Sequence, residues 1–166
     1  MFGAELDYLE GDQAGALKAA RAALAISRET GMGFMGPAIL GVLSLVTEDD
    51  AERHAASAEA EALLATGSIS HNHIFFRCRA IDAYLRVGEC DEAERHANAL
   101  TAYCPEDGLP LIAFFADRGR ALARVGRGES SDELAAETGR LIAEGERMQQ
   151  TVAVADLRRA REVPAS

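Results

Sequence analysis

The chain has 166 residues, which is enough for one domain with a sizeable core or for about four copies of a unit of roughly 40 residues. Its 17 lysine and arginine residues and 27 acidic residues give a formal net charge of −10, so we expect neither nucleic acid nor a membrane surface as a partner. Thirty-three residues are alanine and only 5% are aromatic, which is typical of closely packed helices and argues against a β-sandwich.

The N-terminal half carries apolar residues at helical spacing, interrupted by glycine, proline and acidic residues, and this pattern predicts four helices. Asp12 is placed to cap the second of them, which is expected to end at Gly31. Pro37 fits the first turn of the third helix, and Thr47 with Asp50 resembles a capping box that opens the fourth. The four helices are expected at residues 2–10, 12–30, 37–46 and 47–66.

The C-terminal half continues this pattern and predicts five more helices. They are expected at residues 70–87, 91–103, 111–125, 132–149 and 152–161. Ser70 is expected to cap the first of these five, which ends at Gly88 and leaves Arg77 off its apolar stripe. Ser130 with Glu133 predicts a capping box for the helix at 132–149. The helix at 111–125 is expected to bury Leu111, Phe115, Leu122 and Val125.

Short sequence echoes indicate an internal repeat. Glu-Arg-His-Ala occurs at 52–55 and again at 94–97. Arg-Val-Gly at 86–88 returns at 124–126. Paired helices with a period of about 40 residues predict an all-α fold, a right-handed α-solenoid of about four tetratricopeptide-like (TPR-like) helix-turn-helix repeats.

The predicted repeats form a single domain over residues 1–166, because no long linker divides the chain. The repeat pairs are expected at about 1–31, 33–67, 70–104 and 109–149, followed by a terminal helix at 152–161. The first helix of each pair is expected to line the concave surface of the array.

Cysteine usage and the N-terminus predict a soluble cytoplasmic protein. Cys78, Cys90 and Cys104 are odd in number and lack paired spacing, so they are expected to be reduced thiols. The N-terminus is acidic where a signal peptide would be basic. The most apolar stretch, residues 34–46, is too short for a bilayer, which requires about 20 residues.

No catalytic or cofactor-binding residue is predicted. Residues 31–36 fit Gly-x-Gly-x-x-Gly, but they follow a long predicted helix rather than a strand, so we interpret them as a helix end and a turn. The sequence contains neither a P-loop nor a Gly-x-Ser-x-Gly motif. Cys78 is expected to be a small core residue, whereas Cys90, at a predicted helix start, is the strongest candidate for a reactive thiol.

Two polar clusters are candidate partner-binding residues. His71, Asn72 and His73 open a predicted helix; His71 and His73 are weak candidates for a metal site, and the alternative is a structural role at the helix start. The second cluster comprises Arg120, Arg124 and Arg127, at positions i, i+4 and i+7 of one helix. These arginines form either a solvated face with neighbouring acids or a basic strip that binds an acidic peptide.

The segment from 71 to 128 carries a resemblance. His-Asn-His at 71–73 precedes an aromatic helix start, Asp-Glu-Ala-Glu-Arg follows at 91–95, and Arg-Ala-Leu-Ala and Gly-Arg-Gly come at 120–123 and 126–128. These residues are similar to the C-terminal TPR-like region of bacterial multidomain adenylate/guanylate cyclases. In that family a class III cyclase domain and an AAA-type (STAND) ATPase module precede the helical repeats. Cys90 stands where the family pattern has tryptophan.

The resemblance brings no catalytic residue, because the metal-binding aspartates of the cyclase and the Walker lysine of the ATPase belong to other domains. It implies a non-catalytic regulatory module, either a fragment of such a signalling protein or a free-standing relative, without a cofactor. The expected partner is a protein or peptide segment in the concave groove, contacted by Arg120, Arg124 and Arg127. The alternatives are a small-molecule or metal site near His71 and His73, and a self-assembling scaffold such as a homodimer.

Overall fold

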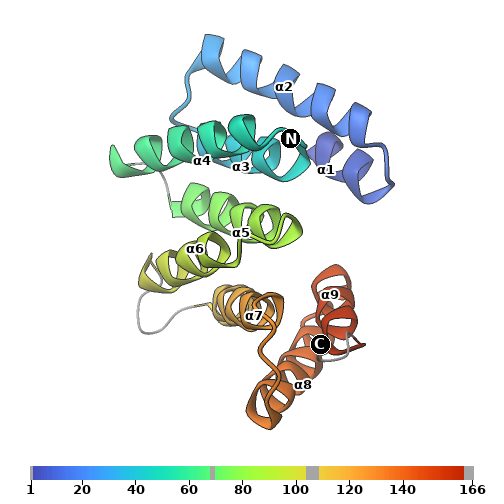
Figure 1. The fold of residues 1–166 in the computed structure, drawn as a ribbon. Coiled ribbons are helices and arrows are strands. Elements are labelled where there is room, and N and C mark those ends of the chain that lie inside the picture. The colour runs from blue at the N-terminus through green and yellow to red at the C-terminus, as the bar shows by residue number, and fades with distance from the viewer. Residues whose placement is uncertain (1, 68–69, 104–108, 163–166) are drawn as a thin grey trace. The chain divides into compact units, whose positions relative to one another are not determined.

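The computed structural model describes residues 2–67, 70–103 and 109–162, which form helices joined by turns (Figure 1). Nine helices and no strand lie in these ranges, so the prediction of an all-α chain is confirmed for them. The helices are α1 (Phe2–Leu9), α2 (Gln13–Thr30), α3 (Gly36–Val46), α4 (Asp50–Ala65), α5 (Ser70–Arg86), α6 (Cys90–Tyr103), α7 (Pro110–Gly126), α8 (Asp132–Arg147) and α9 (Thr151–Glu162).

The chain divides into two compact units, Met1–Ala83 and Tyr84–Ser166, and the division falls within α5. Unit 1 therefore contains the first two predicted repeat pairs, and unit 2 contains the fourth pair and the last helix. The single solenoid over the whole chain stays a prediction.

In unit 1, α3 is the central element. It contacts α1, α2 and α4, and every one of its residues is buried. Its sequence carries no charged side chain, so this burial desolvates no charge. Gly41 allows a close approach to α5, because a Cβ at this position would lie 3.1 Å from Cα of Phe76. No helix in the described ranges, α3 included, is long and apolar enough to cross a membrane.

In unit 2, α7 has the corresponding place, since it contacts α6, α8 and α9. Phe114 of α7 is fully buried in a cluster with side chains of α7, α8 and α9: Ala121, Leu134, Leu141, Ala153 and Leu157. Gly145 of α8 must be glycine here, because a Cβ would lie 2.6 Å from Cγ2 of Val154 and 2.9 Å from Cζ of Phe114.

The predicted buried side of α7 is wrong for Leu111 and only partly confirmed for Phe115, Leu122 and Val125, which pack against the core cluster. Leu111 is 42% exposed, and the other three residues of the predicted stripe are only partly buried. The buried side carries Ile112, Phe114, Ala116 and Ala121 instead. A shift of one residue rotates the buried side by about 100°. Alanine gives a weak hydrophobic signal, so the larger leucine and valine side chains drew the prediction to the neighbouring stripe.

One turn geometry recurs after α1, α5 and α7. Gly11, Gly88 and Gly128 lie at φ +86°, +78° and +82°, a left-handed conformation that glycine adopts without strain. In each turn the glycine N–H donates to the carbonyl three residues back, and the next N–H donates to the carbonyl five residues back, with distances of 2.8–3.2 Å. Gln149, at φ +59°, closes α8 in the same way. The two units therefore use a common turn between paired helices.

The helix caps partly confirm the predictions. Asp12 caps α2, accepting from the Gly15 N–H at 2.9 Å. The predicted cap of α4 is wrong. The side chain of Asp49, rather than that of Thr47, accepts a hydrogen bond from the Glu52 N–H in the first turn of α4. Ser131, not Ser130, caps α8 by accepting from the Leu134 N–H at 3.2 Å. In both corrections the capping residue directly precedes the first helical residue, where its side chain reaches the free amides.

When α4 and α6 are aligned by their buried residues, equivalent positions are 40 residues apart, whereas the repeated Glu-Arg-His-Ala segments are 42 residues apart. Four buried residues of α4 coincide with four buried residues of α6 when they are paired as follows: Arg53 with Ala93, Ala56 with His96, Ser57 with Ala97, and Ala60 with Leu100. The Glu-Arg-His-Ala echo instead aligns the exposed His54 with the fully buried His96. The echo therefore does not mark equivalent positions.

Candidate functional site

Arg120 connects α7 to α6. One nitrogen of its guanidinium group, Nη2, donates to Oδ1 of Asp117 at 2.6 Å within α7. The other terminal nitrogen, Nη1, donates to the side-chain oxygens of Asn98 at 3.2 Å and Thr101 at 3.0 Å in α6. The guanidinium group thus joins two adjacent helices.

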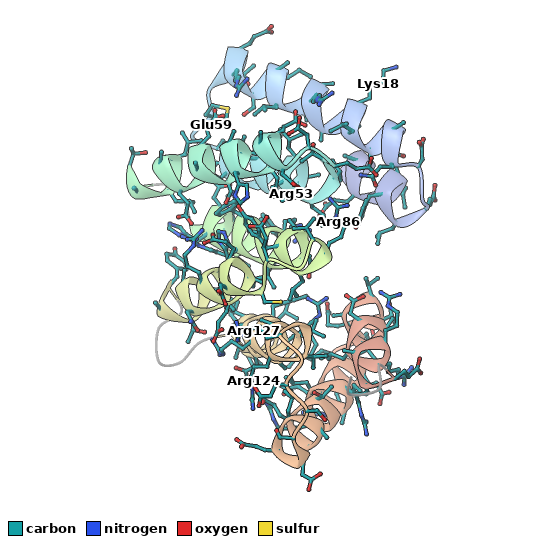
Figure 2. All side chains as sticks on the ribbon, viewed as in Figure 1. Lys18, Arg53, Glu59, Arg86, Arg124 and Arg127 are labelled. Carbon is teal, nitrogen blue, oxygen red and sulfur yellow. The ribbon has the colours of Figure 1, made fainter. Side chains whose placement is uncertain are left out.

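Arg124 connects α7 to α8 through an ion pair with Glu137. Figure 2 labels Arg124 and Arg127, which both belong to α7 or its end. Arg124 binds both carboxylate oxygens of Glu129, with Nε 2.9 Å from Oε2, and its Nη1 donates to Glu137 at 2.7 Å. The hydrogen bonds to Glu129 raise the pKa of Arg124 and lower the pKa of Glu129. Two carboxylates therefore already occupy this guanidinium group.

Arg127, at the end of α7, binds the beginning of α6. Its Nη1 donates to Asp91 at 2.9 Å, and its Nη2 donates to Glu94 at 2.6 Å. The hydrogen bond to Glu94 is the main cause of the raised pKa of Arg127. The three predicted arginines thus lie on one helix of unit 2 and are all bound to acidic or polar side chains of the same unit, as one of the two interpretations expects.

Asn72 holds the turn between α2 and α3. Its side chain is fully buried, and its Nδ2 donates to the carbonyls of Phe34 at 3.0 Å and Gly33 at 3.4 Å. This geometry agrees with the structural alternative for Asn72, because a buried side chain engaged by a turn does not reach a partner.

The ring of His71 lies in an aromatic group beside the same turn. It meets Phe34 edge-on at 5.8 Å between centroids and lies 5.9 Å from Phe75. Its Nε2 is 3.4 Å from the carbonyl oxygen of Phe34. Phe34 itself is 67% exposed. The prediction that His71 contacts a partner stays open, and the neighbouring surface offers aromatic rather than metal-binding chemistry.

His73 is partly buried, and this burial, together with the positive charge of Arg77, lowers its pKa. The neutral imidazole is therefore favoured near pH 7. Among the described residues, no three His, Cys, Asp or Glu side chains come together where they could hold a metal ion. A metal site near His71 and His73 is a prediction without a further ligand in the described ranges.

The glycine-rich segment 31–36 ends one helix and begins the next. The Gly31 N–H donates to the carbonyl of Ser27 at 2.8 Å and closes α2, and α3 begins at Gly36. A dinucleotide fingerprint needs a strand before it, and a helix is found here instead. The interpretation as a helix end and turn is confirmed.

The cysteines pack as small core residues. Cys78 is buried, as predicted. Cys90 is only 7% exposed, and its Sγ would lie 2.5 Å from a Cβ at Gly126. The expectation of a reactive thiol at Cys90 is therefore wrong, since access is required for reactivity and α7 covers this position. Cys104 lies outside the described residues.

Three buried arginines were not predicted from the sequence. Arg53 is 1% exposed, donates to the carbonyl of Thr47 at 3.1 Å and pairs with Asp50. The other two form ion pairs between helices: Arg77 with Glu61, and Arg118 with Asp156. Of these three ion pairs, only the one between Asp50 and Arg53 could be expected from the sequence, because the two residues are three positions apart on one predicted helix. The partners of Arg77 and Arg118 lie 16 and 38 residues away and give no local signal.

Comparisons of the chain with protein families, curated proteins and solved structures found no match. A function is therefore inferred from the residues and contacts of the chain itself.

Proposed function

We propose that the chain is a non-catalytic TPR-like module that binds an acidic protein or peptide segment. The observation that carries this proposal is a shared pattern of neighbours and turns. In unit 1, α1 contacts both α2 and α3; in unit 2, α7 contacts both α8 and α9. Contacts between each helix, its pair and the first helix of the next pair are typical of stacked helical repeats, which use extended surfaces to bind partners.

The arginine strip of α7 is the proposed contact surface. Glu129 and Glu137 show that the Arg124 guanidinium group has room for two carboxylates. Both glutamates are partly exposed, and exposed ion pairs contribute little net free energy. An acidic segment would therefore bind Arg124 by exchanging with these internal carboxylates at small cost. Arg120 and Arg127 would extend the contact along the same helix.

The resemblance to the nucleotide-cyclase regulators supports a regulatory role for this binding. We place the chain as a segment or a free-standing relative of their C-terminal helical region. In a longer parent, a bound segment would shift the equilibrium of an attached catalytic domain through its different affinities for two conformations.

Fluorescence anisotropy with a labelled peptide rich in glutamate and aspartate tests the proposal. A matched peptide with glutamine and asparagine at the acidic positions is the control. The acidic peptide should bind, and the variant E129Q/E137Q should bind it several-fold more tightly, because the internal competitors for Arg124 are removed. The variant R124Q/R127Q should lose the binding.

A control variant separates this exchange from general electrostatics. E29Q/E48Q removes the same two charges at exposed positions that have no cationic partner among the described residues. Its affinity for the acidic peptide should stay close to that of the wild type. Equal tightening in both variants, or no binding in either, would contradict the proposed site.

A further inference from the structure

Two exposed leucines of α1 form an apolar face that no described residue covers. Leu6 and Leu9 are 55% and 61% exposed, whereas Ala4, on the opposite side of the helix, is buried. The side of α1 that carries Ala4 packs on α2 and α3, and Glu5, at the edge of that side, binds Arg79 of α5; the leucines point away from α2 and α3. Large apolar side chains that share an exposed face mark an interaction surface more strongly than scattered ones do.

Carboxylates flank these leucines. Asp7 and Glu10 have no cationic partner within the described residues, and Asp12, which follows, caps α2. The α1 face, defined as Leu6, Asp7, Leu9 and Glu10, is therefore apolar with an unbalanced negative rim. A partner that fits it presents apolar side chains next to cations.

The outer face of α9 has this complementary chemistry. Val152 is 55% exposed and shares one side of the helix with Ala155 and Arg159. The Arg159 side chain is 74% exposed and that of Arg158 is 59% exposed. The α9 face, defined as Val152, Ala155, Arg158 and Arg159, thus combines small apolar side chains with two accessible cations.

Arg158 and Arg159 both have carboxylate partners in the same chain, but these pairs leave the two guanidinium groups able to bind further carboxylates. Arg159 pairs with Asp156, but Asp156 also pairs with the buried Arg118 and is shared between two guanidinium groups. Arg158 pairs with Glu146, and both side chains of this pair are more than half exposed, so the pair contributes little.

We propose that the α1 face of one chain docks on the α9 face of a second copy. Leu6 and Leu9 would cover Val152 and Ala155, while Asp7 and Glu10 would pair with Arg158 and Arg159. The contact joins two different faces, so it forms either a closed ring of copies or an open chain of copies. This self-association goes beyond the proposed peptide binding, which uses α7.

Light scattering coupled to size-exclusion chromatography tests the wild-type chain first. At low salt, the weight-average mass should rise with protein concentration above the 17.7 kDa of one chain. At high salt it should fall, because screening weakens the ion pairs at the contact. A mass that stays at one chain over the whole concentration range would overturn the proposal.

Charge reversal then identifies the two faces. D7R/E10R and R158E/R159E should each remain single chains, since each variant places like charges on both sides of the contact. An equimolar mixture of the two variants should associate again, because every contact between unlike copies restores opposite charges. L6Q/L9Q should also weaken association, and circular dichroism checks that each variant keeps its helix content.

Matched controls place the same charge changes elsewhere. K18E/R161E alters two cations: Lys18 lies on α2, and Arg161 lies on α9 about 200° around the helix from Arg159. E29R/E48R reverses two exposed acids outside the α1 face. Both controls should associate like the wild type. Loss of association in these controls, or no association in the mixture of reversed variants, would refute the assigned faces. Peptide binding to α7 is measured separately and does not depend on this result.

Discussion

Helices α3 and α7 each contact three other helices of their own unit, but the two helices differ in the side chains that make these contacts. In unit 1, α3 is buried on all sides, without a charged side chain. In unit 2, α7 carries Arg118, Arg120, Arg124 and Arg127, and each of them binds a carboxylate. Burial on all sides leaves α3 no surface for a partner, whereas α7 keeps one side open to charged groups. Of these two helices, only α7 therefore offers the charged side that the proposed binding of an acidic segment uses.

The largest expected effect is in the apolar core of unit 1. Leu40 is fully buried in α3, so Leu40→Ala should lower the free energy of unfolding by about 4 kcal/mol, through lost burial and a residual cavity. Urea denaturation followed by circular dichroism measures this change. Ile26→Ala is the matched control: Ile26 is 61% exposed on α2 and lies outside both proposed surfaces, so its substitution should change stability by only about 0.5 kcal/mol. Similar losses for the two variants would contradict the central place of α3.

A smaller effect is expected when the ionic packing of unit 2 is broken. Arg118→Ala removes the buried partner of Asp156 and should cost about 3 kcal/mol, because the pair is mostly withdrawn from water. The double variant R118M/D156L should recover much of this loss, since a buried ion pair can be replaced by apolar side chains of similar size. Urea denaturation of both variants measures the recovery, and a double variant no more stable than Arg118→Ala would show that the charges themselves are needed.

The smallest expected effect is the acid sensitivity of the ion pair between Arg124 and Glu129. Arg124 lowers the pKa of Glu129, so the folded state binds the proton more weakly than the unfolded chain does. The ion pair therefore stabilises the folded state fully above the ordinary glutamate pKa. This stabilisation is lost as the pH falls through the lowered pKa that Glu129 has in the folded state. Glu129→Gln should therefore reduce the loss in urea midpoint between neutral and acidic pH. The acid sensitivity of Glu29→Gln, a control without a cationic partner in the described ranges, should match the wild type.

Capping residues and hydrophobic spacing predicted the positions of the helices well, but they predicted less well which sides of the helices are buried. Asp12 and the glycines Gly11, Gly31 and Gly88 act within a few residues of the helix ends, so they fix these ends without tertiary contacts. The buried side of α7 was misjudged because alanine at Ala116 and Ala121 lets helices approach closely without a strong hydrophobic signal. Composition and spacing thus predicted where the helices lie more accurately than which sides they bury.

The candidate site illustrates the same limit. The spacing of Arg120, Arg124 and Arg127 correctly placed them on one helix, but the carboxylates of Asp91 and Glu94 that bind Arg127 lie 36 and 33 residues away in the sequence. Asn72 was also visible as a polar residue at a helix start, while the carbonyls that it holds belong to a turn 38 and 39 residues earlier. Long-range partners of this kind follow from helix packing, which local patterns do not specify.

The pattern of neighbours also has a consequence for how the chain reaches its native state. Within each unit, most helix pairs in contact are no more than two elements apart in the sequence; the ion pair between Glu5 of α1 and Arg79 of α5, 74 residues apart, is an exception. Few long loops must therefore close before native contacts form, and the search cost in chain entropy is low. Such low contact order predicts refolding within about a millisecond for each unit, with the glycine turns bringing paired helices together early. Stopped-flow or temperature-jump refolding would time these steps directly.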